Sequence, residues 1–439
     1  MRRRFALGAL GAVLVVCVVL LGIALDRPDP FASPAAVVAA IVAVLAVYGL
    51  AAIVVLRSRS LGRSAFAIVL VVAVVARLAL AVQPPELSDD IYRYVWDGRV
   101  QAAGINPYRH APESPALAQL RDVEIYENVN RRFAPTIYPP AAQALFRGTY
   151  AVYADSVVWT KVVFVGVDAL AILLLGLLLH RSGRPPERAL LYAWHPLALI
   201  EVGHSGHVDV AAVTLLLGTL LLLGRKRVVA AGVVLAAAVL VKFYALAVLP
   251  ALLAGSRRAA IKLVTALVAA AGLAYLPFIE VGTRVLGYLP GYLEEEGFDS
   301  GARFYALRLT GLEGATAAAL YQTLAAALLG IVAIAVWRRG AQAEGAALLL
   351  LVTLLVATPA YPWYGLLPLA LLPFAGPRVL VAGSVLAGTM LLLYVQQKAP
   401  GNPEWPLHVV WGGGSLALGI AGLSALRERL PRGRVVHAS

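Results

Sequence analysis

The sequence predicts an all-α polytopic membrane protein, and three observations lead to this fold class. Hydrophobic residues make up 61% of the 439 residues and only 14% are charged, whereas soluble domains carry about 25% charged residues. The apolar residues gather in runs of roughly 20, each long enough to cross about 30 Å of hydrocarbon as a helix. These runs lack the two-residue alternation of membrane β-barrel strands. We therefore expect one transmembrane helix bundle over residues 1–439.

The first three runs place the chain on the far side of the membrane. The run from Phe5 to Leu25 follows MRRR. It is longer than the apolar region of a secretory signal, about 7–15 residues, and no clear cleavage site follows it. We expect an uncleaved first helix at 5–25. Helices at 35–56 and 65–83 then deliver the chain to an external loop.

That loop, residues 84–156, is the longest polar insertion. Loops of this length are usually functional or disordered. Its tyrosines, tryptophans and amphipathic spacing favour ordered, interfacial helices, and it opens with "LSDDIYRYVWDGRVQAAGINPY". A helix at 158–180 returns the chain to the first side.

The remaining helices follow from shorter and longer apolar runs. Helices are expected at 189–202 and 207–224. Two arms of 12 to 14 residues, 228–241 and 243–254, are too short to cross independently and predict a hairpin or re-entrant pair. Further helices are expected at 261–278, 315–337, 344–359, 364–376, 379–395 and 408–425.

Basic residues set the expected orientation. The net charge is +13, but Lys and Arg fall mostly between apolar runs, as the positive-inside rule requires, and do not form the clustered footprint of a nucleic-acid-binding protein. We assign the basic segments to the cytoplasmic side and expect no nucleic-acid partner. These segments are Arg2 to Arg4, Arg57 to Arg63, Arg181 to Arg188, Arg225 to Arg227, Arg257 to Lys262, Arg338/Arg339, Arg378 and Arg427 to Arg434.

With this orientation, the conspicuous polar clusters all fall on the external side. They are Asp89/Asp90, Tyr138, His204/His207/Asp209, Lys242 and Trp363/Tyr364. A single acid at a membrane boundary is most often a helix cap. Two successive acids followed by aromatic and basic residues favour a functional site.

Two basic residues lie in or beside apolar runs. Placing the charge of Lys242 or Arg77 in the membrane interior would cost on the order of 3 kcal/mol, unless an anion or a water-filled cavity lies beside it. Together with Arg93 and Arg303 they could bind a phosphate. The alternatives are that Lys242 snorkels to the surface and that Arg77 pairs with a neighbouring helix or with Asp89.

The histidines and the tyrosines each allow a functional and a purely structural interpretation. His204 and His207 with Asp209, or Asp89 in their place, could hold a divalent metal ion; otherwise the histidines form a hydrogen-bonded turn. Most tyrosines fit an interfacial aromatic belt, but those near the acid pair could stack on a sugar.

Five stretches carry a resemblance to a known family. They are "SDDIYRYVWDGRVQAAGINPY", "IYPPAAQALF", "WHPLALIEVGHSGHVD", "VKFYALAVLPAL" and "PAYPWYGLLPL". Their order, over about residues 85–370, resembles that of the bacterial GT-C glycosyltransferases, in particular the polyprenol-phosphate-mannose-dependent mannosyltransferases. "GHSGHVD" is also similar to a luminal motif of the dolichol-phosphate-glucose enzymes.

The resemblance implies an enzyme of the bacterial cytoplasmic membrane with an extracytoplasmic active site. Its partners would be a polyprenyl-phosphate sugar donor, a glycan or glycolipid acceptor and membrane lipid. Asp90 matches the family's general base through its spacing to Tyr94, and Asp89 could share the role. The donor phosphate would meet Lys242, Arg303, Arg93 and Arg77. The substrate-binding residues would be Tyr94, Tyr138, His204, His207, Trp363 and Tyr364.

The chemistry is consistent with this assignment. A sugar hydroxyl becomes nucleophilic when a carboxylate accepts its proton. A phosphate leaving group is already an anion and needs cations instead of a second acid, so one base and a basic clamp favour an inverting transfer of a hexose. The competing hypothesis is a transporter or flippase with a midplane site. It would predict repeat symmetry between the halves of the chain, and none is visible.

Overall fold

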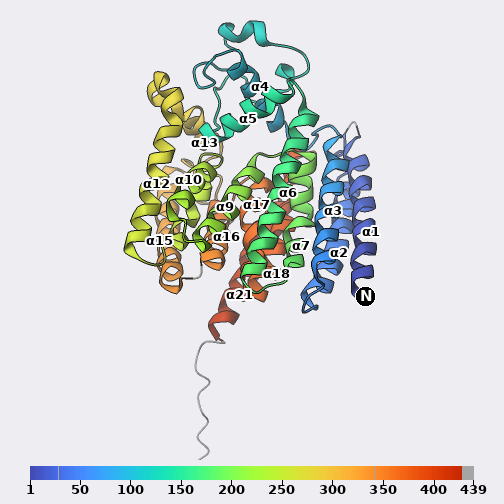
Figure 1. Cartoon of the computed structure of the whole chain (residues 1–439). Coiled ribbons are helices and arrows are strands. Elements are labelled where there is room, and N and C mark those ends of the chain that lie inside the picture. Colours follow the sequence, from blue (N-terminus) through green and yellow to red (C-terminus); the bar gives the residue numbers. More distant parts are fainter. Residues whose placement is uncertain (28, 341, 428–439) are drawn as a thin grey trace, which may run out of the picture.

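The computed structural model describes residues 1–27, 29–340 and 342–427. Within these ranges the chain is built of helices and contains no strand, as Figure 1 shows. Seven helices are long and apolar enough to cross a membrane, which confirms the predicted fold class. They are α1 (Arg2–Leu25), α2 (Ala35–Leu56), α3 (Arg63–Ala81), α6 (Val157–Arg181), the continuous stretch Arg257–Glu295 that begins with α12 (Arg257–Tyr275), α15 (Ala315–Arg339) and the stretch Pro377–Lys398 that begins with α18 (Pro377–Thr389).

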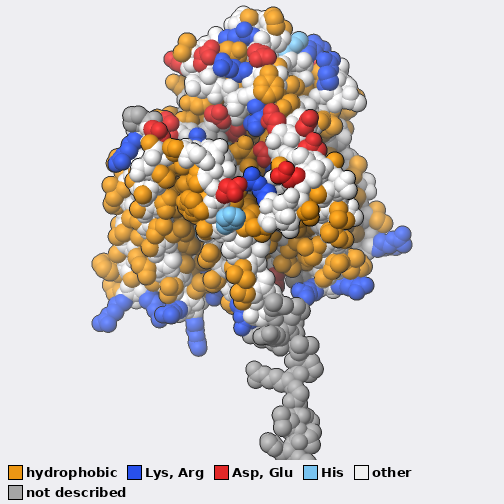
Figure 2. Space-filling view, turned by 180° about the vertical axis from the view of Figure 1, so that it is seen from behind, with side chains coloured by type: hydrophobic (Ala, Val, Ile, Leu, Met, Phe, Trp, Pro, Cys, Tyr) orange, Lys and Arg blue, Asp and Glu red, His pale blue; other side chains and the backbone are white. Residues whose placement is uncertain are grey.

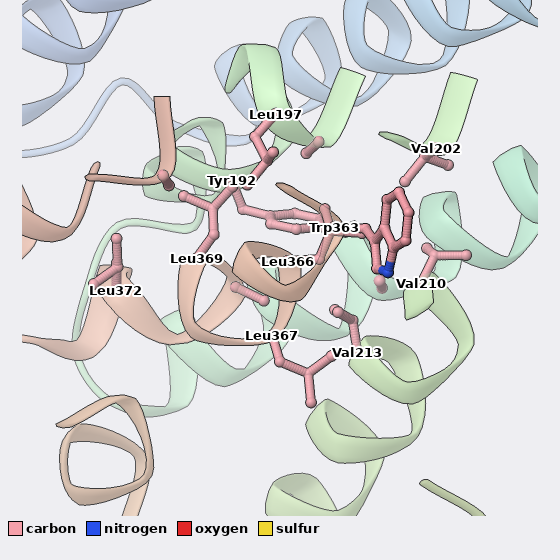
Figure 3. Packing of buried hydrophobic residues seen from close by; sticks show 14 of the residues in the cluster. Tyr192, Leu197, Val202, Val210, Val213, Trp363, Leu366, Leu367, Leu369 and Leu372 are labelled. Atoms are coloured by element: carbon pink, nitrogen blue, oxygen red, sulfur yellow. The ribbon is translucent and has the colours of Figure 1, made fainter. Parts of the chain in front are cut away.

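Shorter apolar helices fill the interior between these spans. They are α9 (Asp209–Gly224), α10 (Val228–Val239), η5 and α11 (Phe243–Leu252), α16 (Gln342–Ala357) and the stretch Pro362–Phe374 that includes α17 (Leu366–Leu371). The two predicted arms correspond to α10 and to η5 with α11. Figure 3 shows the leucines of α17 packed between Val213 of α9 and Tyr192. This packing fixes Trp363, which precedes α17, at one end of the core.

The predicted helix at 189–202 is broken in the structure. The chain forms η3 (Pro186–Ala189), α7 (Leu190–Ala193), α8 (Pro196–Leu199) and the π-helical η4 (Ile200–His204). Pro196 lacks the amide hydrogen that a continuous helix needs there, and the His195 side chain accepts a hydrogen bond from the Leu197 amide. The break turns the chain so that residues 201–209 reach the end of the bundle nearest the outer loop.

The outer loop, residues 84–156, is ordered because it has a small core of its own. It contains α4 (Asp90–Ala102), η1 (Pro115–Leu120), η2 (Tyr126–Asn128) and α5 (Pro140–Val152), and it caps the upper end of the bundle in Figure 1. Its core includes Trp96, Leu117 and Ile125. Gly98 permits the close packing of α4 on α5, since a Cβ at this position would lie 2.8 Å from the Phe146 carbonyl oxygen.

Lys and Arg side chains gather at the end of the bundle opposite this loop. Figure 2 shows them along the lower edge, below a flank that is largely apolar. The N-terminus lies at the same end. Of the predicted basic segment Arg427 to Arg434, the part beyond Arg427 lies outside the described residues.

Candidate active site

A cavity of about 750 Å³ lies between the outer loop and the bundle. This volume is within the range of small-molecule sites. Its walls come from five parts of the chain: residues 85–93, 128–139, 241–244, 288–303 and 350–398. Figure 2 shows acidic and basic side chains in the band between the outer loop and the apolar body.

Eight of the residues singled out by sequence line this one cavity. They are Asp89, Asp90, Arg93, Tyr138, Lys242, Arg303, Trp363 and Tyr364. They are up to about 275 positions apart in sequence, so the fold and not their spacing brings them together. Arg77, Tyr94, His204, His207 and Asp209 do not line it.

The two adjacent acids stand at the start of α4 and share a neighbour. Asn130 Nδ2 donates to Asp89 Oδ1 and to Asp90 Oδ1, both at 2.8 Å. The Tyr138 hydroxyl donates to Asp90 Oδ2 at 3.2 Å, and the Asp90 side chain is 15% exposed. Burial and then the charge of Asp90 raise the pKa of Asp89, against the hydrogen bond from Asn130. Asp90 is therefore held by two donors at the cavity wall.

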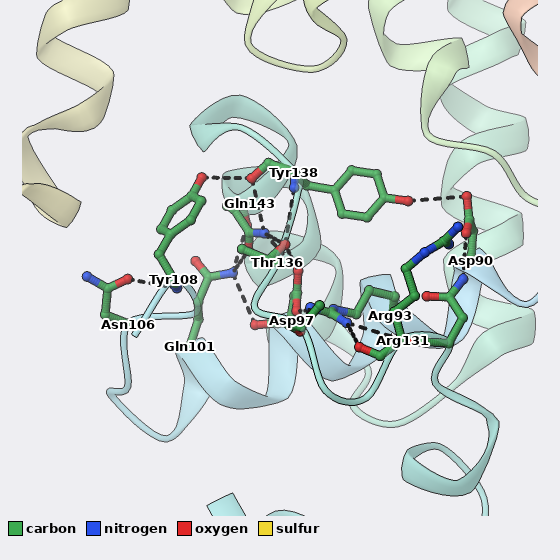
Figure 4. Close-up of polar contacts among 12 residues, drawn as sticks. Asp90, Arg93, Asp97, Gln101, Asn106, Tyr108, Arg131, Thr136, Tyr138 and Gln143 are labelled. Carbon is green, nitrogen blue, oxygen red and sulfur yellow. Dashed lines mark hydrogen bonds and ion pairs between the residues drawn. The ribbon is translucent and has the colours of Figure 1, made fainter. Parts of the chain in front are cut away.

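A buried polar network fixes the turn that carries Tyr138. Asp97 accepts hydrogen bonds from Thr136 Oγ1 at 2.5 Å and Gln143 Nε2 at 2.8 Å, and the Tyr138 amide donates to Thr136 Oγ1 at 3.2 Å. Burial raises the pKa of Asp97 despite the charge of Arg93. Figure 4 shows this network beside the Tyr138 ring, whose hydroxyl points at Asp90. The network fixes the backbone of Tyr138 through the bond between its amide and Thr136.

The three cavity cations that were expected from the sequence each have a carboxylate partner. The ion pairs are Lys242 Nζ with Asp209 Oδ2 at 3.0 Å, Arg93 Nε with Asp97 Oδ1 at 3.2 Å, and Arg303 Nη1 with Glu296. Lys242 also lies over the rings of Tyr138 and Tyr364, 5.6 and 5.7 Å from their centroids. These pairs keep several positive charges in one partly apolar space.

Two further cations of the cavity were not singled out by sequence. Arg131 pairs with Glu295 at 2.6 Å and lies over the Tyr292 ring. Lys398 lines the cavity, and among the described residues it has no ion-pair partner. Both stand in polar loop sequences, "NVNRRF" and "QQKAPGNPEWP", where nothing distinguishes them from ordinary surface charges.

Arg77 lies away from the cavity, inside the bundle. Its Nε atom is 2.8 Å from Asp168 Oδ2, and both side chains are fully buried. Arg77 Nη1 donates to the Ala193 carbonyl at 2.8 Å, and the Tyr192 hydroxyl donates to Asp168. Of the two alternatives for Arg77, the structure shows pairing with a neighbouring helix.

The four candidate metal ligands do not come together. Among the described residues, no group of three or more His, Cys, Asp or Glu side chains is arranged to hold a metal ion. Asp209 is engaged by Lys242, and the His207 ring is stacked on Trp363 with 4.0 Å between centroids. His204 is buried. The stretch from His204 to Asp209 is therefore a buried turn.

The aromatic residues divide into a buried group and a cavity group. Tyr94 is buried and stacks on Phe146 at 4.6 Å. Trp363 lies between His207 and Tyr361, whose ring centroid is 4.4 Å away, so both faces of its indole are covered. Tyr361 and Tyr364 are thus better placed than Trp363 to meet a sugar face.

The family model described as alpha-(1->6)-mannopyranosyltransferase, N-terminal domain, matches residues 5–256. The match covers more than half of the chain and includes the acid pair, the Tyr138 turn and Lys242. No curated protein matches the chain. The match confirms the resemblance to mannosyltransferases seen in the sequence motifs. The chain therefore belongs to the alpha-(1->6)-mannopyranosyltransferase family and is a multi-pass membrane glycosyltransferase.

Proposed function

We propose that this mannosyltransferase takes mannose from a polyprenyl-phosphate carrier and transfers it, with inversion, to a hydroxyl of an extracytoplasmic glycan or glycolipid. The observation that carries the proposal is the placement of Asp90. Its carboxylate stands at the wall of a cavity whose other walls supply cations and apolar side chains. The family match leaves the transporter hypothesis without support.

In the proposed reaction Asp90 is the base. As the acceptor oxygen forms a bond to C1 of mannose, its proton moves to the Asp90 carboxylate and the bond from C1 to the phosphate oxygen breaks. The phosphate leaves as an anion, so no general acid is required. Because inversion reverses the configuration at C1, an α-linked product requires a β-linked donor.

The donor phosphate is assigned to the cations of the cavity. Lys242, Arg303 and Arg93 were expected from sequence, and Lys398 joins them as the cation without an ion-pair partner among the described residues. A charge-assisted hydrogen bond to phosphate is about twice as strong as a neutral one. Paired cations would exchange part of their carboxylate contact for the phosphate.

The apolar wall suits the lipid part of the donor. Leu289 and Leu293 of α13 (Leu289–Glu295) face the cavity together with Leu350 and Leu354 of α16. Burying one CH₂ of a prenyl chain against such a wall contributes about 0.8 kcal/mol. The cavity thus offers an apolar side for the carrier and a polar side for the acceptor.

We place the cavity on the extracytoplasmic side of the bacterial cytoplasmic membrane. The basic residues at the opposite end of the bundle support this orientation, because Lys and Arg are enriched in cytoplasmic segments. Polyprenyl-linked sugars and glycans of the cell envelope would both reach the cavity from that side.

The test is transfer by purified full-length protein supplied with β-mannosyl polyprenyl phosphate and a mannose-containing acceptor. We expect Asp90→Asn to abolish transfer and to leave donor binding and the melting temperature unchanged. Asp26→Asn, at an exposed position after α1, is the matched control and should be fully active. Undiminished transfer by Asp90→Asn would refute the base, and transfer from a nucleotide sugar alone would refute the donor class.

A further inference from the structure

A buried polar cluster lies directly behind Asp90, on the side away from the cavity. It contains His207, which follows η4, and Glu201, inside η4. We infer that these two residues form a proton-sharing triad with Asp90 and act as its positioning residues. The inference deepens the proposed function and rests on the role of Asp90 as base.

The three groups are neighbours, with His207 between the two carboxyl groups, and neither ring nitrogen of His207 forms a hydrogen bond in the structure. His207 Nδ1 is 3.9 Å from Asp90 Oδ2, and His207 Nε2 is 3.3 Å from Glu201 Oε2. The Tyr394 hydroxyl donates to Glu201 Oε2 at 2.9 Å. The His207 and Glu201 side chains are fully buried, and stacking on Trp363 fixes the orientation of the imidazole.

The charge balance requires Glu201 and His207 to act together. Among the described residues, Glu201 makes no ion pair with Lys or Arg, and His207 is the basic group within reach. A buried carboxylate without a counter-charge is strongly unfavourable. The pair therefore holds one proton between Glu201 and His207.

The other charged and titratable groups around His207 are accounted for. On α4, Asp90 faces Nδ1; at the start of α9, Asp209 is engaged by Lys242 at 3.0 Å. The hydroxyls of Tyr138 and Tyr394 donate to Asp90 and Glu201. None of these groups neutralises the negative charge of the Glu201 carboxylate, so the counter-charge must come from His207.

The backbone explains why the cluster is rigid. Residues 200–204 form a π-helical turn, a geometry that often occurs at functional sites, and the His207 amide donates to the Glu201 carbonyl at 2.8 Å. Gly206 has φ +69°, and a Cβ there would lie 2.5 Å from Ile91 Cδ1. This glycine lets the turn contact α4 one residue beyond Asp90, so both ends of the triad are fixed to each other.

The triad serves the reaction as follows. When the shared proton is on His207, the imidazolium faces the Asp90 carboxylate from its buried side and stabilises the anion. The proton of the acceptor hydroxyl moves to Asp90 as the acceptor oxygen bonds to C1 and the bond from C1 to the phosphate oxygen breaks. The triad then holds two protons among three groups, and one returns to water from Asp90 after the product leaves.

The variant that tests the inference is Glu201→Gln in the full-length protein. Gln cannot give a proton to His207, so the imidazolium that faces Asp90 can no longer form from this pair. We expect kcat to fall about 10- to 100-fold, with the KM values of donor and acceptor unchanged. The acidic limb of the kcat–pH profile should move to higher pH. A purely structural defect would lower kcat by the same factor at every pH.

Two further variants control for misfolding. His195→Gln changes a buried imidazole in the same broken helix, which contacts the Ser384 carbonyl, and it should keep the wild-type pH profile. Tyr394→Phe removes the hydrogen bond to Glu201 and the longer 3.5 Å contact with the Ser205 hydroxyl, and it should shift the profile in the same direction by a smaller amount. If Glu201→Gln or Tyr394→Phe folds and keeps the wild-type kcat and profile, the inference is overturned.

A measurement without substrate separates this inference from the proposed function. The ¹⁵N resonances of the His207 imidazole, assigned by their loss in His207→Gln, should shift in Glu201→Gln and in Asp90→Asn. An unchanged imidazole spectrum in both variants would refute the triad even if transfer is observed. Failure of wild-type transfer from the polyprenyl-phosphate donor would refute the proposed function and leave this spectral test intact.

Discussion

Replacing Lys242 by methionine separates its structural role from its proposed role at the donor phosphate. Lys242 and Asp209 form an ion pair at 3.0 Å, in which the lysine side chain is 14% exposed and the aspartate is fully buried. Lys242→Met therefore leaves a buried carboxylate without a partner, which costs about 3–5 kcal/mol of unfolding free energy. Asp209→Asn should cost less, because the lysine it leaves unpaired borders the cavity.

The double variant Lys242→Met/Asp209→Asn removes both charges. We expect its stability to return close to that of the wild type, since replacing a whole buried pair by neutral side chains of similar volume is often neutral. Donor affinity should not return. Loss of one charge-assisted hydrogen bond to phosphate, about 1.5–3 kcal/mol, corresponds to roughly 10- to 100-fold weaker binding.

The assays are thermal unfolding in detergent and equilibrium binding of a polyprenyl phosphate. Stability is compared across the wild type, the two single variants and the double variant. Two results contradict the reasoning. Equal stability of Lys242→Met and the wild type would mean that the buried Asp209 carboxylate does not need Lys242 as a counter-charge. Wild-type donor affinity in the double variant would remove Lys242 from the phosphate site.

The other predictions concern the base, the unpaired cation and the outer loop. Tyr138→Phe removes the hydroxyl that donates to Asp90 at 3.2 Å, so kcat should fall about 10-fold or more with the melting temperature kept; an unchanged kcat would mean that this bond does not act in the reaction. Lys398→Ala should weaken donor binding about 10-fold and Lys398→Arg should restore it; equal affinities in both variants would exclude this cation. Burial raises the pKa of Asp122, but the hydrogen bonds from Arg99 and two backbone amides outweigh it and hold the pKa below its usual value. The stability that Asp122 contributes is therefore present above its unfolded-state pKa, about 3.9, and is lost as the pH falls through the folded value. The difference in melting temperature between the wild type and Arg99→Gln should narrow toward the acidic end of the range pH 7 to 3, and the bond from Arg99 to the Leu120 carbonyl should keep part of it.

Hydrophobic runs were sufficient to place most helices, because the membrane requires each span to satisfy its backbone internally. The predicted spans at 35–56 and 158–180 differ by at most one residue from α2 and α6. The stretch 189–202 was wrong as a single helix. Its hydropathy is continuous, but Pro196 interrupts the backbone hydrogen bonds, and a hydropathy argument does not register that loss.

The site was predictable as a set of residue types and not as a set of contacts. Asp89 and Asp90 stand out because two acids after an apolar run are rare, whereas Glu201 lies inside "WHPLALIEVGHSGHVD" and reads as part of a turn. Its importance comes from complete burial beside His207. Arg77 shows the reverse case, since its apolar surroundings suggested a functional cation and the structure gives it Asp168 as a partner.

The pairing of the cavity cations also bears on how the site exists before a substrate arrives. Unpaired Lys and Arg side chains beside an apolar wall would each carry a large desolvation cost. Two of the partners come from another element than the cation: Asp209 of α9 pairs with Lys242, and Glu295 at the end of α13 pairs with Arg131. An entering phosphate would compete with these carboxylates, so its net contribution is the difference between two ion pairs. Specificity for the donor must then depend on fit to the whole cavity, the apolar wall included, and not on positive charge alone.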